Sequence, residues 1–363
     1  MLEELKKDID KDLIRLINTS PLGIYIKKSS PLLHDGIKDF LKRPGKRIRP
    51  IFFLLSYLGY TKKRKIDRPR LIRSSLSMEL LHSFLLMHDD VIDNSDLRRG
   101  QLSLHRLFNK IYKVPPHDKL GYDLSIVTGD IVFSMAIKEL SQVKEDPKNI
   151  MNAVSILADT AAYTGLGEYI DVVNDSKKID KITKNDILFT YRMKTSKYTF
   201  EGPLLIGSTL AGARKSETSK LERLGCLLGQ GFQIQDDLLD IFLFSDETGK
   251  PPFKDLEESK RTLLMQDTYA RLDKRGKKAI SSLLDKKNKT KKDISVILGL
   301  IRSSGSGIYC LNEIKRFTSL SKKIISGLKI KAIYRTLLEQ FVNELDKKTC
   351  LLEKRVLLHG ERP

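Results

Sequence analysis

Two short acidic segments carry the residues best suited to chemistry. In HDDVID (88–93) and in QDDLLD (235–240), two adjacent aspartates are followed by a third at the end of the segment. Both segments interrupt stretches that otherwise read as apolar helix, and we call them the first and second aspartate boxes. Residues four apart share one face of a helix, so the outer aspartates of each box project together. The six side chains are Asp89, Asp90, Asp93, Asp236, Asp237 and Asp240.

Paired acids on an apolar helix need a compensating charge. Like charges at a spacing of four repel one another, and burial adds to the cost unless the charges are paired or bound to metal. Hard carboxylate oxygens favour Mg²⁺, Mn²⁺ or Ca²⁺ over zinc, and Mg²⁺ completes its shell with water and phosphate oxygens. The boxes therefore suit metals that bridge a polyphosphate. The alternative is an exposed polar helix face that carries acids by chance.

Basic residues stand near both boxes in sequence. Arginine forks and lysine point charges are the usual partners of diphosphate, although each cluster alone is typical of ordinary surface. His82 precedes Asp89 by two helical turns, so it shares the face of Asp89. The basic residues occur in PGKRIRP (Lys46, Arg47, Arg49), in RRG (Arg98, Arg99), in YRMKTS (Lys194) and in GKPPFKDLEESK (Lys250, Lys260).

Composition bounds the class of protein. The 363 residues carry a net charge of +20 and are 40% hydrophobic. That charge fits either a lysine-rich surface or an anionic partner, which could be nucleic acid, acidic lipid or a phosphorylated substrate. Three widely spaced cysteines, Cys226, Cys310 and Cys350, favour a reducing, cytoplasmic setting without disulfides or a zinc site. No secretion signal and no run of about 18 apolar residues is found, so we expect no membrane-spanning helix.

Helical periodicity runs through most of the chain, and strand patterns are scarce, which predicts an all-α protein. We expect one helical domain over 1–346 and a loosely docked tail over 347–363. Basic runs such as DKKNKTKKD (285–293) are expected to be exposed connections. Helices are predicted over 31–41, 51–60, 71–93, 120–140, 149–172, 186–211, 218–244, 262–284, 293–302 and 308–346.

Five segments resemble, in order, the motifs of the trans-isoprenyl diphosphate synthases, and most of all the archaeal-type short-chain geranylgeranyl diphosphate synthases. The resemblance extends from about residue 40 to residue 265. It implies an antiparallel helical bundle around a central cavity, and head-to-tail condensation of isopentenyl diphosphate with an allylic diphosphate. The segments are GKRIRP, ELLHSFLLMHDDVIDNSDLRRG, KTSKYTFEGPLLIG, GQGFQIQDDLLDIF and GKPPFKDLEESKRT.

The resemblance also implies partners and roles for single residues. The two boxes face each other across the cavity mouth and hold roughly two or three Mg²⁺ ions against the allylic diphosphate. Asp89, Asp93 and Asp236 resemble metal ligands, with Asp90, Asp237 and Asp240 beside them. Lys46, Arg49, His82 and Arg99 resemble the isopentenyl diphosphate site, whereas Arg98, Lys194, Lys250 and Lys260 resemble the groups on the allylic diphosphate. Thr195 and Gln233 resemble the polar groups near the developing allylic cation. A homodimer is implied, with neither nucleic acid nor stable membrane insertion.

Departures from the family pattern occur in two loops. Pro44 replaces a usual glycine and cannot donate a backbone N–H. Phe253 and Lys254 occupy positions that are usually small, and Ser259 replaces another usual glycine. These differences bear on the conformation of the loops.

Product length is predicted from the residues just before the first box. Phe84 lies five positions before Asp89, which places it roughly 7–8 Å deeper along the helix. Within the family, an aromatic residue at this position beside an aliphatic one resembles the pattern of enzymes that make a C20 product. Here the aliphatic neighbour is Leu85. A C15 or longer product stays open, as does plain core packing of Phe84.

The same residues bear on three other functions. A basic nucleic-acid-binding helical protein would explain the net charge but not the acids on apolar helices. A terpene cyclase shares the metal-diphosphate logic, but it needs no second diphosphate site such as GKRIRP. A regulatory subunit of a heteromeric synthase would not need both boxes intact.

Overall fold

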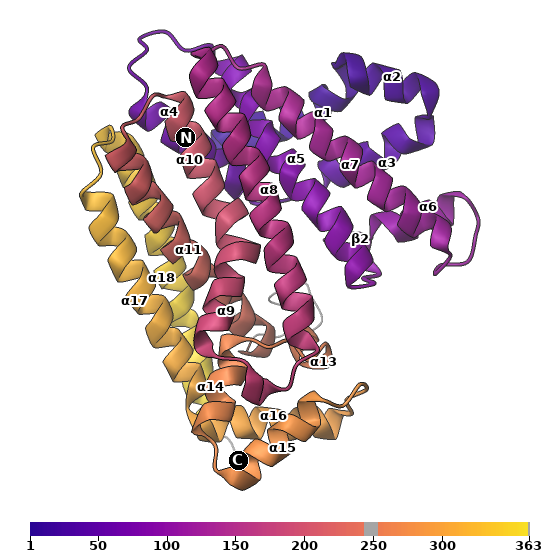
Figure 1. Cartoon of the computed structure of the whole chain (residues 1–363), viewed down its shortest axis with the longest axis vertical. Coiled ribbons are helices and arrows are strands. Elements are labelled where there is room, and N and C mark those ends of the chain that lie inside the picture. The colour runs from indigo at the N-terminus through magenta and orange to yellow at the C-terminus, as the bar shows by residue number, and fades with distance from the viewer. Residues whose placement is uncertain (243–252, 362–363) are drawn as a thin grey trace. The chain divides into compact units, whose positions relative to one another are not determined.

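The computed structural model describes residues 1–242 and 253–361, with side chains described as far as Leu357. The described chain is helical apart from one short hairpin, so the predicted all-α class is confirmed. It divides into two compact units (Figure 1). Unit 1 comprises Met1–Asp159 and Gly202–Thr218, and unit 2 comprises Thr160–Glu201 and Ser219 onward.

Unit 1 is built around α5, the helix that carries the first box. Helix α5 runs side by side with α7, and α4 packs on α10 (Figure 1). Leu76, Leu80 and Leu81 of α5 are fully buried in the core. The elements of unit 1 are α1 (Leu2–Thr19), α2 (Pro21–Ser29), α3 (Pro31–Lys42), α4 (Ile48–Tyr60), α5 (Arg68–Ile92), β1 (Leu97–Arg98), β2 (Gln101–Leu102), α6 (Leu104–Ile111), α7 (Lys119–Ser141), the first half of α8 (Pro147–Asp175) and α10 (Gly202–Leu210).

Local sequence explains where α5 begins and ends. The Asp67 side chain accepts a hydrogen bond from the backbone N–H of Arg70, which caps the helix start, and a proline follows within the first turn. The helix ends at Ile92, inside the first box. The hairpin β1–β2 then turns through Arg99 and Gly100, which have φ angles of 55° and 74°. Positive φ at both central residues matches the tight turn that suits the twist of a two-stranded ribbon.

Unit 2 carries the second box on α11. Helices α17 and α18 run side by side (Figure 1), and α14 packs on α17, α16 and α9. Ile234 and Leu238 of α11 are buried in the hydrophobic core of this unit. Its elements are the second half of α8, η1 (Ile179–Lys181), α9 (Lys184–Tyr191), η2 (Arg192–Glu201), α11 (Lys215–Phe242), α13 (Lys254–Glu257), α14 (Leu263–Arg271), α15 (Lys274–Leu284), α16 (Lys291–Ser304), α17 (Ser306–Ser326) and α18 (Ala332–Glu361).

The segment η2 is a π-helix of 10 residues, and it interrupts the helix predicted over 186–211. A π-helix is wider than an α-helix, so its neighbours must leave room for it. A Cβ added at Gly167 of α8 would stand 2.3 Å from the backbone nitrogen of Lys194, and one at Gly229 of α11 would stand 2.4 Å from Cα of Ser196. These glycines let α8 and α11 approach the wide backbone of η2 closely.

Residues 347–361 of the expected tail belong to a helix. Helix α18 continues through the expected tail to Glu361. It stays docked because Leu352 is 1% exposed and the Thr349 hydroxyl accepts a hydrogen bond from Gln235 at 2.9 Å. The tail is therefore part of unit 2 as far as its side chains are described.

Within residues 1–242 and 253–361, α7 is long and apolar enough to cross a membrane. Helices α16 and α17 together would also pass that test if their 62° bend were read as one broken span. The sequence predicted no such stretch, because Asp123, Asp130 and Lys138 interrupt the apolar run of α7. A core helix passes the same test, and Val132 and Leu140 of α7 are buried in unit 1.

Candidate active site

The first box lies at the C-terminal end of α5, where one arginine holds two of its acids. Arg98 Nη2 donates to Asp89 Oδ2 at 2.9 Å, and Arg98 Nε donates to Asp90 Oδ1 at 2.6 Å. Asp90 is fully buried, and burial raises its pKa to about 6 although Arg98 opposes the shift. Asp89 and Asp93 are only half-buried. The box thus combines one buried acid with two that solvent reaches.

A cluster of cations surrounds His82 in the same unit. Arg99 Nη2 lies 3.3 Å from His82 Nε2, and Arg99 Nη1 donates to the Arg43 carbonyl at 3.3 Å. Burial, together with Arg49 and Arg99, lowers the pKa of His82 well below its ordinary value. Burial also lowers the pKa of Arg99, with neighbouring arginines contributing. Such a site favours binding of an anion, because the cations repel one another until negative charge arrives.

The basic motif at 44–50 divides its residues between solvent and core. Lys46 is exposed and Arg49 is half-buried. Arg47 is instead buried: it pairs with Glu79 and with Asp10, and it donates to the Arg43 carbonyl at 2.9 Å. Arg47 therefore supports the fold, and sequence alone could not separate it from its two neighbours.

Arginine side chains lie close to the backbone at Gly45. A Cβ added at Gly45 would lie 3.1 Å from Arg99 Nη1 and 3.3 Å from Arg47 Nη1. Gly45 thus leaves room for two guanidinium groups beside the loop. Pro44, the departure from the family pattern, is exposed.

The second box, on α11 in unit 2, is held by neutral donors. Asp237 is 4% exposed and accepts hydrogen bonds from the Tyr191 hydroxyl and from Gln233 Nε2. The oxygens of Asp240 accept the backbone N–H groups of Lys254 at 3.2 Å and Asp255 at 3.1 Å, which caps the start of α13. Asp236 is exposed. Asp237 is thus buried, Asp240 is half-buried, and Asp236 is the most exposed of the three acids.

Asp255 is a fourth acid of this region, and the sequence reading did not select it. Burial raises its pKa to about 7, with Asp240 and Asp236 adding to the shift. Burial likewise raises the pKa of Asp237, with Asp255 the next largest cause. These carboxylates therefore carry mutual repulsion that a divalent cation would relieve. The signal in the sequence was the position of Asp255 within the quoted motif GKPPFKDLEESKRT.

Thr195 and Gln233, predicted to lie near the allylic cation, are brought together. The Thr195 hydroxyl donates to Gln233 Oε1 at 2.6 Å, and Gln233 Nε2 donates to Asp237 Oδ1 at 2.9 Å. Asp237 thus fixes the orientation of the Gln233 amide. With its proton committed to Gln233, the Thr195 hydroxyl presents lone pairs to any further neighbour.

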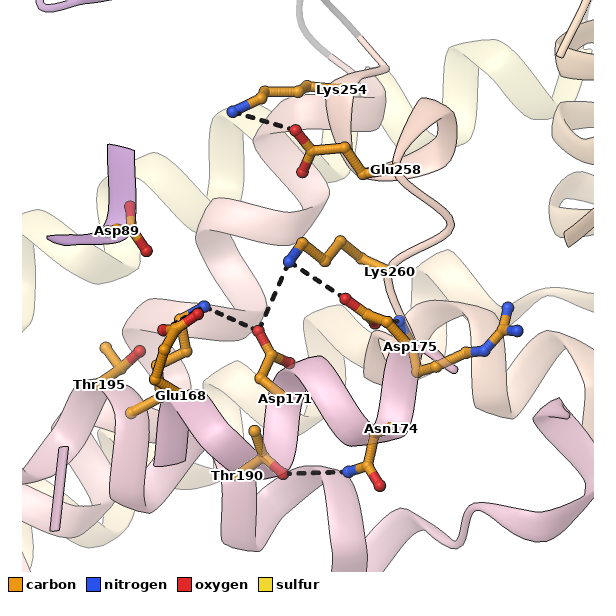
Figure 2. Close-up of polar contacts among 12 residues, drawn as sticks. Asp89, Glu168, Asp171, Asn174, Asp175, Thr190, Thr195, Lys254, Glu258 and Lys260 are labelled. Atoms are coloured by element: carbon orange, nitrogen blue, oxygen red, sulfur yellow. Dashed lines mark hydrogen bonds and ion pairs between the residues drawn. The ribbon is translucent and has the colours of Figure 1, made fainter. Parts of the chain in front are cut away.

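Two of the predicted diphosphate lysines converge on α8. Lys194 Nζ lies 2.7 Å from Asp171 Oδ2 and 2.8 Å from Glu168 Oε2. Lys260 Nζ lies 3.2 Å from Asp175 Oδ2 and 3.7 Å from the same oxygen of Asp171 (Figure 2). Asp171 therefore stands between two lysines that are distant in sequence. The third predicted lysine, Lys250, lies outside the described residues.

The sequence reading missed the acids of α8. Glu168, Asp171 and Asp175 follow one another at spacings of three and four in GEYIDVVND, so they share one helical face. That spacing was the available signal.

The residues predicted to set chain length, Phe84 and Leu85, lie on α5 in unit 1. The Phe84 ring stacks on Phe133 of α7 at a centroid distance of 5.0 Å and meets the His88 ring edge-on at 4.6 Å. Phe84 and Leu85 are both partly buried. Packing on α7 is therefore one observed role of Phe84.

The donor set at both boxes fits a hard divalent cation. Every aspartate in the boxes offers oxygen, and the buried Asp90 Oδ2 has no hydrogen-bond partner. Among the described residues, no group of three or more His, Cys, Asp or Glu side chains is already gathered around a metal position. Mg²⁺ commonly takes one or two carboxylates and fills its shell with water and phosphate oxygens, so a smaller set suffices.

Comparison with known proteins adds independent evidence. A family model described as Polyprenyl synthetase matches residues 30–301. Geranylgeranyl pyrophosphate synthase of Geoglobus acetivorans is 30% identical over 264 residues, which cover 71% of this chain and 75% of that protein. Geranylfarnesyl diphosphate synthase of Natronomonas pharaonis is 29% identical over 246 residues, covering 64% and 67% of the two chains.

A solved structure shares the fold. Geranylgeranyl pyrophosphate synthase of Corynebacterium glutamicum, crystallised with isoprenyl diphosphate and magnesium, matches with a TM-score of 0.86. The match covers 96% of this chain and 99% of that one at 24% sequence identity. The fold is therefore that of the all-α isoprenoid synthases.

Proposed function

We propose that this chain, which belongs to the polyprenyl synthetase family and is a trans-prenyltransferase, condenses isopentenyl diphosphate with allylic diphosphates to give mainly the C20 product geranylgeranyl diphosphate. The observation that carries the assignment of sites is the convergence of Lys194 and Lys260 on Asp171. Two lysines at one place supply the paired cations that a diphosphate needs. The arginine cluster around His82 supplies the second diphosphate site.

The chemistry follows from these groups. In the allylic substrate the bond between C1 and oxygen breaks, the electron pair leaves with diphosphate, and a carbocation forms. Lys194 and Lys260 stabilise the departing charge, and the lone pairs of Thr195 face the positive carbon. The double bond of isopentenyl diphosphate attacks that carbon, and the proton then lost passes to the released diphosphate. Mg²⁺ held by Asp89, Asp93 and Asp236 supplies further neutralisation of diphosphate when it is bound.

Water must be kept from the carbocation, because water would add to the carbocation and give an alcohol. We propose that the growing chain fills a cavity closed to water.

Product length rests on Phe84. A bulky ring five residues before Asp89 would stop the chain at about 20 carbons, and its stacking on Phe133 holds the ring in place. One relative is named for a longer product, so C15 and longer products are the alternatives. Phe84→Ala should therefore lengthen the product distribution, and an unchanged distribution would remove Phe84 from this role.

We also propose a homodimer. Helix α8 exposes large apolar side chains that a second copy would cover, among them Met151 at 69% and Tyr169 at 68%. A cytoplasmic, reducing location is supported by the three free cysteines. Sedimentation analysis tests the dimer.

The experiment that tests the function uses labelled isopentenyl diphosphate with each of the C5, C10 and C15 primers, with Mg²⁺ and with EDTA. The products are dephosphorylated and sized by chromatography. We expect Mg²⁺-dependent extension of all three primers to C20. No extension of any primer would contradict the proposal, and a C15 or longer limit would correct the product length alone.

A further inference from the structure

Lys260 stands between two residues that contact one distant connection. The Ser259 hydroxyl accepts a hydrogen bond from Lys289 Nζ. On the other side, Arg261 Nη2 donates to Asp285 Oδ1 at 3.5 Å. Asp285 and Lys289 both belong to the connection 285–290 between α15 and α16. The basic run that the sequence predicted to be an exposed connection therefore touches the chain on both sides of Lys260.

Lys289 differs from the rest of its connection. The other residues of 285–290 are exposed, whereas Lys289 is partly buried. Besides Ser259, it donates to the Lys286 carbonyl at 3.0 Å. Burial lowers its pKa, with Arg261 the next largest cause. Partial burial of the charged Lys289 side chain costs solvation free energy, and the hydrogen bond to Ser259 offsets that cost.

Ser259 is itself unusual. Its φ is 63°, in the left-handed region that glycine adopts freely and that other residues adopt at a cost. This explains why glycine is usual here in the family to which the chain belongs. Ser259 adopts this conformation despite the strain. Its hydroxyl accepts the hydrogen bond from Lys289, which glycine could not do. A hydrogen bond to a charged donor is among the stronger kinds.

The opposite side of the segment is fixed by α8. The backbone N–H of Arg261 donates to Asp175 Oδ1 at 3.2 Å, while its side chain donates twice to the Lys177 carbonyl, at 3.1 and 2.9 Å. Lys260 pairs with the other oxygen of Asp175 at 3.2 Å. The position of Lys260 thus depends on two supports, the end of α8 and the connection 285–290.

We propose that the connection 285–290 is a strap that positions Lys260 through the contact between Lys289 and Ser259. Lys289 and Ser259 are positioning residues, which act on the allylic diphosphate only through Lys260. Their effect on catalysis rests on the function proposed above, whereas their effect on the segment 253–261 does not.

Hydrogen exchange of the full chain tests the strap without any turnover. The amide of Ser259 donates to the Leu256 carbonyl at 3.1 Å and that of Lys260 to the Asp255 carbonyl at 2.9 Å, so both report on the segment. We expect Lys289→Met and Ser259→Ala to speed exchange over 253–261. Lys287→Met is the matched control, because Lys287 is exposed on the same connection. Equal exchange in Lys289→Met and Lys287→Met would overturn the proposal.

Steady-state kinetics test the consequence. Lys289→Met and Ser259→Ala should each raise KM for the allylic diphosphate by about three- to tenfold and leave KM for isopentenyl diphosphate unchanged. Lys289→Met added to Ser259→Ala should change nothing further. Ser259→Gly should stay closer to the unmodified chain than Ser259→Ala, since glycine adopts the positive φ without strain.

The outcomes separate the two proposals. If Lys289→Met raises KM equally with and without the Ser259 hydroxyl, Lys289 acts as a direct charge and the strap is wrong. If the unmodified chain extends no primer, the proposed function is wrong, and hydrogen exchange still decides on the strap.

Discussion

The two units differ in the groups that surround their cations. Around His82 in unit 1, Arg49, Arg98 and Arg99 crowd together, and the pKa values of His82 and Arg99 are lowered. In unit 2, Lys194 and Lys260 are each paired with carboxylates of α8. At the first site His82 and Arg99 lie beside further arginines, of which Arg98 is paired with Asp89 and Asp90. At the second site both lysines are paired with carboxylates until a substrate displaces these internal partners.

The difference indicates two ways of binding a diphosphate. A site in which cations crowd one another attracts an anionic ligand strongly but costs stability when empty. A site with internal carboxylates keeps the empty protein stable, and its lysines must exchange partners on binding. We expect the two kinds of site to respond differently to mutation.

The largest effects should come from one solvent-accessible acid of each box. Asp89→Ala and Asp236→Ala should each lower turnover by about a thousandfold or more, because charge stabilisation of the leaving diphosphate is lost. Turnover with labelled isopentenyl diphosphate measures this. Asp180→Ala, which removes an exposed acid of η1, is the control and should leave turnover unchanged. Loss at only one box would show that one unit alone holds the metal.

Removing a cation from each site should change stability in different ways. Lys194→Met leaves Glu168 and Asp171 facing each other, so the free energy of unfolding should fall by about 1–2 kcal/mol. Arg99→Met relieves repulsion and should change that free energy by less than about 0.5 kcal/mol. Urea unfolding of the substrate-free protein measures both. Equal losses would contradict the contrast between the units, even if both variants lose activity.

A smaller effect should appear in the dependence of stability on pH. His82 takes up a proton in the unfolded chain near its ordinary pKa, but in the folded chain its pKa is well below that value. The folded state is therefore disfavoured as the pH falls below about 6.5, by up to about 1.4 kcal/mol per pH unit. His82→Gln should remove this part of the slope. If the unfolding free energies of the two proteins run parallel between pH 7.5 and 5.5, the pKa of His82 is not lowered in the folded chain.

Much of the helical framework was predictable, because apolar spacing marks buried faces. The predicted helix over 71–93 is observed as Arg68–Ile92, and that over 120–140 as Lys119–Ser141. The predicted helix over 308–346 is two helices, α17 and α18, since apolar periodicity continues past the break at Gly327. The hairpin that carries Arg98 was not predicted, because two-residue strands are too short to show alternation.

The site was less predictable, because the role of a charged residue depends on partners remote in sequence. Arg47 faces the core only because Glu79 and Asp10 meet it there. Asp237 is buried because Tyr191 and Gln233 satisfy it. The motifs located the right segments, but they could not tell which members of a segment face solvent.

The wide helix η2 has a consequence for how the sequence can change. In an α-helix each N–H bonds to the carbonyl four residues back, whereas in a π-helix the step is five. A chain that lost one residue between Arg192 and Glu201 could rewind the segment into ordinary α-helix, filling less of the space that Gly167 and Gly229 leave. Thr195 would then swing by about 100° around the helix axis, away from Gln233. Variants with a deletion in this segment should thus fold well but lack catalytic turnover. Selection for turnover alone should therefore keep the length of the segment constant.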